Sequence, residues 1–173
     1  FNLKRIQLAL SKLNHPERKL YNVIQVIGSD GKFSVLRALR FFIEENKQTV
    51  STHVSPSITD IRERFWMGDR YLTHQEIKKT IKKIEKLKIP LTIYEVLTLV
   101  FIINASNKNT DYVIQEAGCL WKLDSNNVID FPLMQIIVNI NKQHLNFLKI
   151  KTLNEVINQK VGFLSNFTNI YIG

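Results

Sequence analysis

Cysteine is almost absent from the 173-residue sequence: Cys119 is the single one, so the chain cannot form an internal disulfide. This cysteine usage fits a reducing compartment. Long hydrophobic runs are also missing, because no apolar stretch reaches the roughly 18 residues that a transmembrane helix requires. The sequence contains neither an internal repeat nor a low-complexity linker. These absences argue against a disulfide-stabilised secreted domain and a membrane protein, and they predict a cytoplasmic location.

Acidic residues are few relative to basic ones, with 15 Asp and Glu against 24 Lys and Arg, which gives a formal net charge of +9. Such a charge would suit a polyanion partner. The basic residues, however, are spread along polar helix faces and are not interleaved with aromatic side chains. We therefore interpret most of the charge as a solvated surface and expect no nucleic-acid or membrane partner. The clearest example is a group of six lysines: Lys78, Lys79, Lys82, Lys83, Lys86 and Lys88.

The length and composition are typical of one globular domain. Hydrophobic residues make up 45% of the chain and charged residues 23%, which allows a sizeable core and excludes a disordered chain. The chain begins at Phe1 and stops at Gly173, directly after a strand-like stretch. We therefore expect residues 1–173 to be a partial domain of a longer protein, and we expect a monomer.

Helical and strand patterns alternate along the sequence. Apolar residues at helical spacing predict helices at residues 3–13, 33–45, 73–87 and 92–105. Three capping boxes, each a threonine followed three residues later by glutamate, open helices at Thr73, Thr92 and Thr152. Apolar runs predict strands at residues 21–28, 49–55, 112–118 and 134–140, whereas residues 59–72 are predicted to be a loop. This order predicts an α/β fold with a mostly parallel sheet, helices on both faces and ligands at the carboxyl ends of the strands.

Residues 23–34 are the most informative segment. An apolar strand stops at Gly28, a short polar loop continues through Gly31 and Lys32, and a helical pattern follows. Glycines let the backbone direct several N–H groups toward an anion, the helix adds its positive end, and the lysine supplies a mobile charge. The segment therefore predicts a phosphate-binding loop. The loop is shorter than a Walker A loop, and Phe33 stands where Walker A has Ser or Thr, so an ordinary strand-to-helix turn is the alternative.

Three polar residues are predicted at neighbouring strand ends. Ser55 follows the second strand, Glu116 ends the third, and His144 lies in the loop after the fourth. Oxygen ligands gathered there would suit a magnesium ion that shares its shell with phosphates. The alternatives are a turn cap for Ser55 and a surface position for His144. Glu116 is harder to explain otherwise, because a buried carboxylate is costly without a cation or a donor. No metal-ligand spacing links the other histidines, which are His15, His53 and His74.

Several stretches resemble one known family. Residues 26–34, V-I-G-S-D-G-K-F-S, are similar to the loop V-A-G-T-N-G-K-G-S of folylpolyglutamate synthase and dihydrofolate synthase, relatives of the Mur ligases. Five more stretches resemble motifs of this family in the family's order: 13–16 (L-G-x-P), 54–58 (T-S-P-H-L), 62–65 (N-E-R-I), 92–98 (T-x-F-E-x-L-T) and 116–127 (E-V-G-L-G-G-R-L-D-A-T-N). Gln143-His144 resembles D-H, and residues 153–163 resemble L-x-x-I-A-x-E-K-A-G-I. The resemblance covers nearly the whole chain.

The resemblance implies a P-loop NTPase-like fold of the Mur ligase central-domain type and an ATP-dependent amide ligase. In this family the carboxylate of a folate or dihydropteroate takes the γ-phosphoryl group of ATP, and the amino group of L-glutamate then attacks the acyl phosphate. Positioning and charge neutralisation dominate such phosphoryl transfer. The implied cofactors are ATP and Mg²⁺, and the implied partners are small-molecule substrates. Because family members have more chain, including a C-terminal domain, we expect no turnover by this chain alone.

The resemblance also implies roles for individual residues. Lys32 would hold the β and γ phosphates, within a nucleotide-binding loop formed by Gly28, Ser29, Asp30, Gly31, Lys32 and Ser34. Ser55 and Glu116 would coordinate magnesium, and His144 would contribute to the metal and phosphate site. Lys160 would be carbamylated and become a carboxylate-like metal ligand. Lys32, His144 and Lys160 are thus the candidate catalytic residues. Without the family, Lys160 is a lysine that stabilises the C-terminal end of a helix.

Some residues depart from the family motifs. Phe33 replaces a glycine that lies next to phosphate, and Asp30 adds a negative charge where the family has Asn. Both are expected to weaken ATP binding, since glycine at such a position permits close approach of the backbone. Ser57 replaces the histidine of T-S-P-H. The alternative to a ligase is therefore a degenerate, non-catalytic relative that serves as a binding or interaction module.

Overall fold

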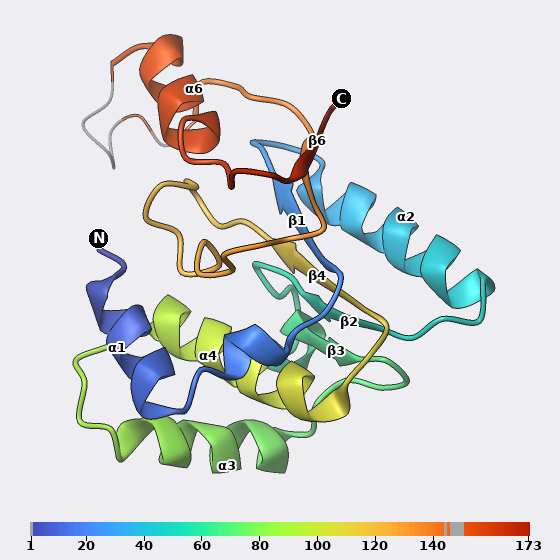
Figure 1. Ribbon diagram of the computed structural model, residues 1–173, viewed down its shortest axis with the longest axis vertical. Coiled ribbons are helices and arrows are strands. Elements are labelled where there is room, and N and C mark those ends of the chain that lie inside the picture. The colour runs from blue at the N-terminus through green and yellow to red at the C-terminus, as the bar shows by residue number, and fades with distance from the viewer. Residues whose placement is uncertain (1, 144, 146–150) are drawn as a thin grey trace.

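The computed structural model describes residues 2–143, 145 and 151–173, and six strands in this part of the chain form one sheet (Figure 1). The strands lie in the order β3-β2-β4-β1-β5-β6. Their bounds are β1 Val23–Ile27, β2 Val50–His53, β3 Phe65–Met67, β4 Tyr112–Glu116, β5 Met134–Ile137 and β6 Asn169–Ile172. The β2–β3 pair is antiparallel and the other four pairs are parallel. The predicted mostly parallel sheet is confirmed.

Helices cover both faces of the sheet, as the sequence predicts (Figure 1). One face carries α1 (Lys4–Lys12), the short η1 (Pro16–Lys19), α3 (His74–Glu85) and α4 (Ile93–Lys108). The other face carries α2 (Lys32–Glu45), which packs on β1, β2 and β4. The last helix, α6 (Leu153–Val161), lies near the end of the molecule where the chain terminates (Figure 1). In the described part of the chain, no helix combines the length and apolar character needed to cross a membrane.

Burial of α4 organises the larger part of the core. This helix is apolar on nearly all sides, and four consecutive residues, 99–102, are completely buried. It is enclosed by α1, α3, η1 and the sheet, which explains how so hydrophobic a helix is kept from water. In contrast, α3 buries only one stripe, including Ile77 and Ile84. The four lysines of α3 and the two that follow it, Lys86 and Lys88, are all exposed, so the predicted solvated surface is confirmed for this group.

Local sequence signals set the start of three helices. The three predicted capping boxes are all present, at Thr73, Thr92 and Thr152, and each threonine side chain accepts a hydrogen bond from the backbone of the glutamate three residues later. The predicted loop over residues 59–72 is wrong in part, because it contains η2 (Ile61–Arg64) and β3. β3 has three residues and pairs with β2 alone, which is too short a strand to produce a recognisable alternation.

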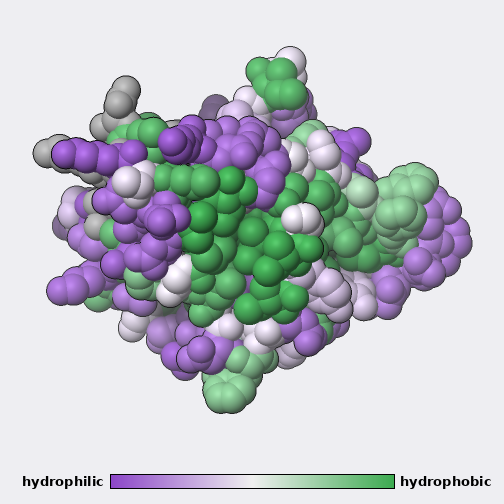
Figure 2. Space-filling view, turned by 90° about the horizontal axis from the view of Figure 1, so that it is seen from above, coloured by the Kyte–Doolittle hydropathy of each residue, from purple (hydrophilic) through white to green (hydrophobic). Residues whose placement is uncertain are grey.

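An apolar area lies at the upper end of the molecule. Figure 2, which looks onto this end, shows a broad hydrophobic surface bordered by hydrophilic residues. Strand β6 ends the sheet here, and the exposed fractions of Ile170, Tyr171 and Ile172 are 46%, 56% and 78%. β6 is therefore an edge strand whose apolar side chains face solvent.

Candidate functional site

The loop between β1 and α2 is the predicted phosphate-binding loop. It runs from Gly28 to Gly31 at the carboxyl end of β1, and α2 begins at Lys32. At Gly28 φ is +151°, and a Cβ atom there would lie 2.9 Å from the carbonyl oxygen of Asn139, so the position requires glycine. The first N–H groups of a helix have no acceptor within the helix. The start of α2 therefore presents donors where the loop would receive an anion.

The segment after β5 closes this loop from the other side. The Ser29 N–H donates to the carbonyl oxygen of Asn139 at 2.9 Å, and the Asp30 N–H donates to Asn139 Oδ1 at 2.8 Å. The Asp30 carboxylate accepts from Asn141 Nδ2 at 2.8 Å and from Gln143 Nε2 at 2.7 Å. These two amides lower the pKa of Asp30. The carboxylate that departs from the family motif is therefore ionised and bound by neutral amides.

Two lysines converge on the same loop from different helices. Lys32 Nζ, from α2, donates to the carbonyl oxygen of Ser29 at 2.9 Å. Lys160 Nζ, from α6, donates to the carbonyl oxygen of Gly28 at 2.7 Å and to that of Cys119 at 3.1 Å. Lys160 is 2% exposed, and burial together with the charge of Lys32 lowers its pKa to about 8. The helix C-terminal alternative for Lys160 thus does not account for its position.

Glu116 and Ser55 meet at the ends of β4 and β2. The Ser55 N–H donates to Glu116 Oε2 at 3.1 Å, and Glu116 is 4% exposed. Burial raises the pKa of Glu116, although the Ser55 N–H and the charges of Lys32 and Arg64 oppose this effect. Glu116 is thus buried beside a backbone donor, and Lys32 and Arg64 lie near enough for their charges to act on its pKa.

Only part of the predicted metal site is visible in the described ranges. Within residues 2–143, 145 and 151–173, no group of three or more His, Cys, Asp or Glu side chains could hold a metal ion. His144 lies outside the described residues. The Ser55 hydroxyl and the Glu116 carboxylate are hard oxygen donors of the kind that magnesium prefers. They fit a magnesium ion whose remaining ligands come from phosphate oxygens and water.

The first turn of α2 carries two exposed side chains, those of Phe33 and Ser34. Phe33 is 43% exposed, and its ring centroid lies 5.8 Å from the guanidinium carbon of Arg37, one turn further along α2. The bulk of Phe33 therefore lies along the outer side of the helix. Ser34, in the first turn of α2, is also exposed.

A cavity of about 670 Å³ opens beside the loop. Lys32, Ser55 and Arg64 border it, and apolar residues of α1 and of the segment after β4 form much of its wall, namely Leu3, Ile6, Ala117, Leu120 and Leu123. Such a volume, apolar with a few polar groups, suits a small organic ligand. Because Lys32 borders both, a ligand in the cavity would lie next to a phosphate group in the loop.

Sequence reasoning missed three polar residues in and behind the cavity wall. Asp124 accepts from the N–H groups of Gly118 at 2.7 Å and Asn126 at 2.9 Å, and burial raises its pKa to about 6. Asn126 and His53 are completely buried, and His53 Nδ1 lies 3.3 Å from Asn126 Oδ1. Burial lowers the pKa of His53 to about 4, so the ring is neutral. The polar run at 124–127 was the available signal.

Comparison with known proteins identifies relatives. No protein-family model matches the chain. It is 29% identical over 171 residues to the dihydrofolate synthase/folylpolyglutamate synthase of Bacillus subtilis, which covers 94% of this chain and 39% of that protein. E. coli FolC in complex with ADP superposes with a TM-score of 0.92 at 22% identity, over 99% of this chain and 42% of that one. A bifunctional folylpolyglutamate synthase/dihydrofolate synthase with Mn, AMPPNP and L-glutamate bound gives 0.90 at 22%, over 99% and 42%.

These relatives are of the same family that the loop and the later motifs of the sequence resemble. The chain spans about two fifths of the length of the relatives that it matches. The structural matches establish the fold, and the sequence match to the Bacillus subtilis protein extends over nearly all of this chain. The chain is thus similar over nearly its whole length to folylpolyglutamate synthase and dihydrofolate synthase, and the similarity covers about two fifths of those proteins.

Proposed function

We propose that this chain is the amino-terminal, ATP-binding part of an amide ligase that adds L-glutamate to a folate or dihydropteroate through an acyl phosphate. The observation that carries the proposal is the convergence of Lys32 and Lys160 on one glycine loop, with Glu116 buried at the end of the neighbouring strand β4, where the charge of Lys32 acts on it. Two lysines and a carboxylate are costly to gather in a buried place unless anions and a cation bind there. A solved structure with Mn, AMPPNP and L-glutamate supports the same ligand set.

In this proposal the loop residues bind and orient the nucleotide. The start of α2 and Lys32 neutralise the β and γ phosphates, which favours transfer of the γ-phosphoryl group to the substrate carboxylate. Ser55 and Glu116 would hold magnesium, and His144, which lies outside the described residues, would contribute to the same site. When bound, magnesium supplies charge neutralisation and orients the phosphates. The acceptor occupies the 670 Å³ cavity, with its carboxylate directed toward Lys32.

The role proposed for Lys160 is that of a carbamylated metal ligand. Its amine donates to the carbonyl oxygens of Gly28 and Cys119, an arrangement that suits the unmodified side chain. A carbamate has a single N–H, so it would leave one of these carbonyls without its donor and would bring a negative charge beside both. Carbamylation of Lys160 is therefore expected only when a metal ion is bound nearby.

Because the chain corresponds to about two fifths of its relatives, the remainder would supply the other parts of the nucleotide and glutamate sites. We propose that the complete enzyme acts in the cytoplasm and that this chain alone does not turn over. The single exposed cysteine and the absence of disulfides among the described residues fit a reducing compartment.

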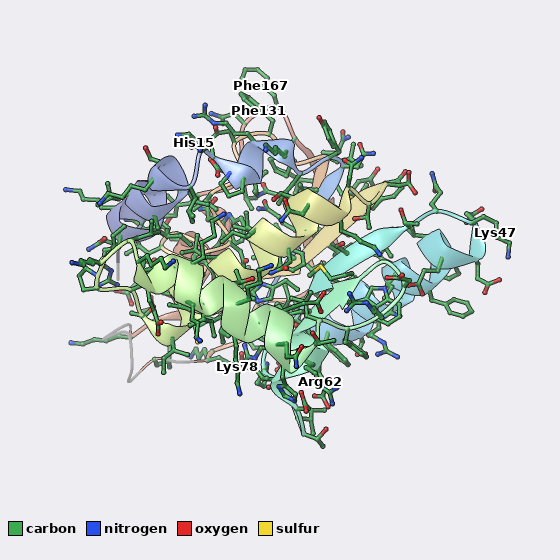
Figure 3. The ribbon with its side chains drawn as sticks, turned by 90° about the horizontal axis from the view of Figure 1, so that it is seen from below. His15, Lys47, Arg62, Lys78, Phe131 and Phe167 are labelled. Atoms are coloured by element: carbon green, nitrogen blue, oxygen red, sulfur yellow. The ribbon has the colours of Figure 1, made fainter. Side chains whose placement is uncertain are left out.

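Isothermal calorimetry of ATP with Mg²⁺ tests the proposal directly. The unsubstituted chain is expected to bind with micromolar or tighter affinity, and Lys32→Ala is expected to weaken binding at least about tenfold, or roughly 1.4 kcal/mol. Lys47→Ala is the matched control, because Lys47 is exposed in the turn after α2 and projects away from the molecule (Figure 3).

The result that would contradict the proposal is equally clear. If the chain does not bind Mg²⁺-ATP, or if Lys32→Ala binds as well as Lys47→Ala, the loop is not a phosphate site in this chain. The alternative of a non-catalytic module would then be favoured. Circular dichroism of each variant shows whether the fold is retained.

A further inference from the structure

Tyr94, in the first turn of α4, lines the cavity. The family motif that residues 92–98 resemble has Phe at this position, so the hydroxyl group is a feature of this chain. The hydroxyl group of a tyrosine has one proton to donate.

The amide of Asn126 determines where that proton points. Asn126 Nδ2 lies 3.0 Å from the carbonyl oxygen of Glu116, which can only accept a hydrogen bond. The NH₂ group must therefore be on this side of the amide, and Oδ1 must face His53 Nδ1 at 3.3 Å. His53 in turn carries its proton on Nδ1. Since His53 and Asn126 are completely buried, water does not compete for this arrangement.

The same NH₂ group is also 3.0 Å from the Tyr94 hydroxyl oxygen. An amide NH₂ has no lone pair available as an acceptor, so Tyr94 accepts this hydrogen bond and cannot donate toward Asn126. Its own proton must be directed elsewhere. Tyr94 and Ser55 both line the cavity, so the Tyr94 hydroxyl has the cavity beside it.

Gly118 provides the space for this hydroxyl. A Cβ atom at position 118 would lie 3.1 Å from both Cζ and Oη of Tyr94 and 2.8 Å from Asp124 Oδ2. Any side chain there would displace the phenol or the carboxylate next to it. The ring is held from its other side by stacking on His53, with ring centroids 6.3 Å apart.

We propose that Tyr94 is a specificity-determining residue of the acceptor cavity, where its hydroxyl donates a hydrogen bond to a carbonyl or carboxylate oxygen of the substrate. Asn126 is the positioning residue that directs the donor into the cavity. The inference rests on the proposed function in one respect, that a folate or dihydropteroate occupies the cavity. We therefore expect the unsubstituted chain to prefer ligands with an oxygen acceptor near position 94 more strongly than Tyr94→Phe does.

The test is calorimetric titration of the chain with folic acid in the absence of nucleotide. Tyr94→Phe is expected to weaken binding about three- to tenfold, the usual effect of losing one hydrogen bond. Tyr21→Phe is the matched control, because Tyr21 is 63% exposed and does not line the cavity, and its affinity should equal that of the unsubstituted chain.

A spectroscopic measurement separates hydrogen bonding from a structural effect. With tyrosines labelled with ¹³C at Cζ, the Tyr94 resonance is assigned by its loss in Tyr94→Phe, and it is expected to shift when folic acid saturates the unsubstituted chain. Equal affinities of Tyr94→Phe and Tyr21→Phe, or an unmoved Tyr94 resonance, would overturn the inference alone. If folic acid fails to bind the unsubstituted chain, the acceptor assignment falls as well, whereas the Mg²⁺-ATP titration still tests the phosphate site.

Discussion

Asp124 is a carboxylate with almost no access to solvent, and it lies where the cavity wall meets the end of β4. It is 7% exposed and accepts hydrogen bonds from two backbone N–H groups, those of Gly118 and Asn126. The hydrogen bonds favour the ionised form, but burial dominates and raises its pKa to about 6 from 3.8. Folding therefore favours the protonated form of this side chain.

Asp124 should make the stability of the chain depend on pH. Because its folded pKa is above its unfolded pKa, its stabilising contribution is full below about pH 4 and is lost as pH rises through about 6. The difference of about two pKa units corresponds to roughly 3 kcal/mol. Urea unfolding of Asp124→Asn should therefore show a weaker loss of stability between pH 4 and pH 7 than unfolding of the unsubstituted chain. Parallel pH profiles for the two proteins would contradict this account.

At the scale of helices and strands, a row of buried polar side chains crosses the sheet. Adjacent strands place His53, Gln115, Gln25 and Gln135 in register, and all four are completely buried. Gln135 Nε2 donates to Gln25 Oε1 at 2.8 Å, and Gln25 Nε2 donates to the carbonyl oxygen of Asn126 at 3.0 Å. Among the described residues, neither amide atom of Gln115 has a hydrogen-bond partner.

Two substitutions in this row should have opposite effects. Gln115→Leu removes two buried polar atoms that have no partner, so we expect it to raise the free energy of unfolding by about 1–2 kcal/mol. Gln135→Leu leaves Gln25 Oε1 and the Ser165 N–H without their partner, so we expect a loss of about 1–3 kcal/mol. Urea unfolding with unchanged m-values would measure both. Destabilisation of equal size in the two variants would show that the hydrogen bonds do not distinguish them.

The helices and strands differ in how well they could be predicted from the sequence. Apolar periodicity and capping boxes predicted α3 and α4, because both signals depend only on residues close together in the sequence. β3 was missed because a three-residue strand depends on pairing with β2. In the candidate site, residue patterns indicated Lys32, Ser55 and Glu116, and the family resemblance alone indicated Lys160; their roles stay predictions. The Asn126 network was not, since it forms only when β4, β2 and α4 pack together.

At the scale of the whole molecule, the lysines of α3 are separated from the site. The lysines of α3 are exposed, and α3 lies at the opposite end of the molecule from α6 and the chain terminus (Figure 1). At physiological ionic strength, exposed charges are screened over about 8 Å. The lysines of α3 should therefore contribute little to nucleotide binding.

Charge reversal tests this separation. The double substitution Lys78→Glu and Lys82→Glu should lower retention on a cation-exchange column, while the affinity for Mg²⁺-ATP at physiological salt stays within about twofold of the unsubstituted value. Lys78 is exposed on α3 (Figure 3), so its replacement is expected to leave the core intact. A tenfold change in nucleotide affinity would instead indicate long-range electrostatic attraction.

The contact of the glycine loop with Asn139 determines when, during synthesis of the chain, the loop can bind phosphate. Lys32 and the glycines are synthesised early, but the contact of Asp30 with Asn139 joins residues 109 positions apart. Until β5 and the residues after it have left the ribosome, the loop lacks the partner that fixes Ser29 and Asp30. A nascent chain that already carries the lysine should therefore not yet recognise phosphate. Nucleotide binding would begin only when translation has supplied the strand on the far side of β1.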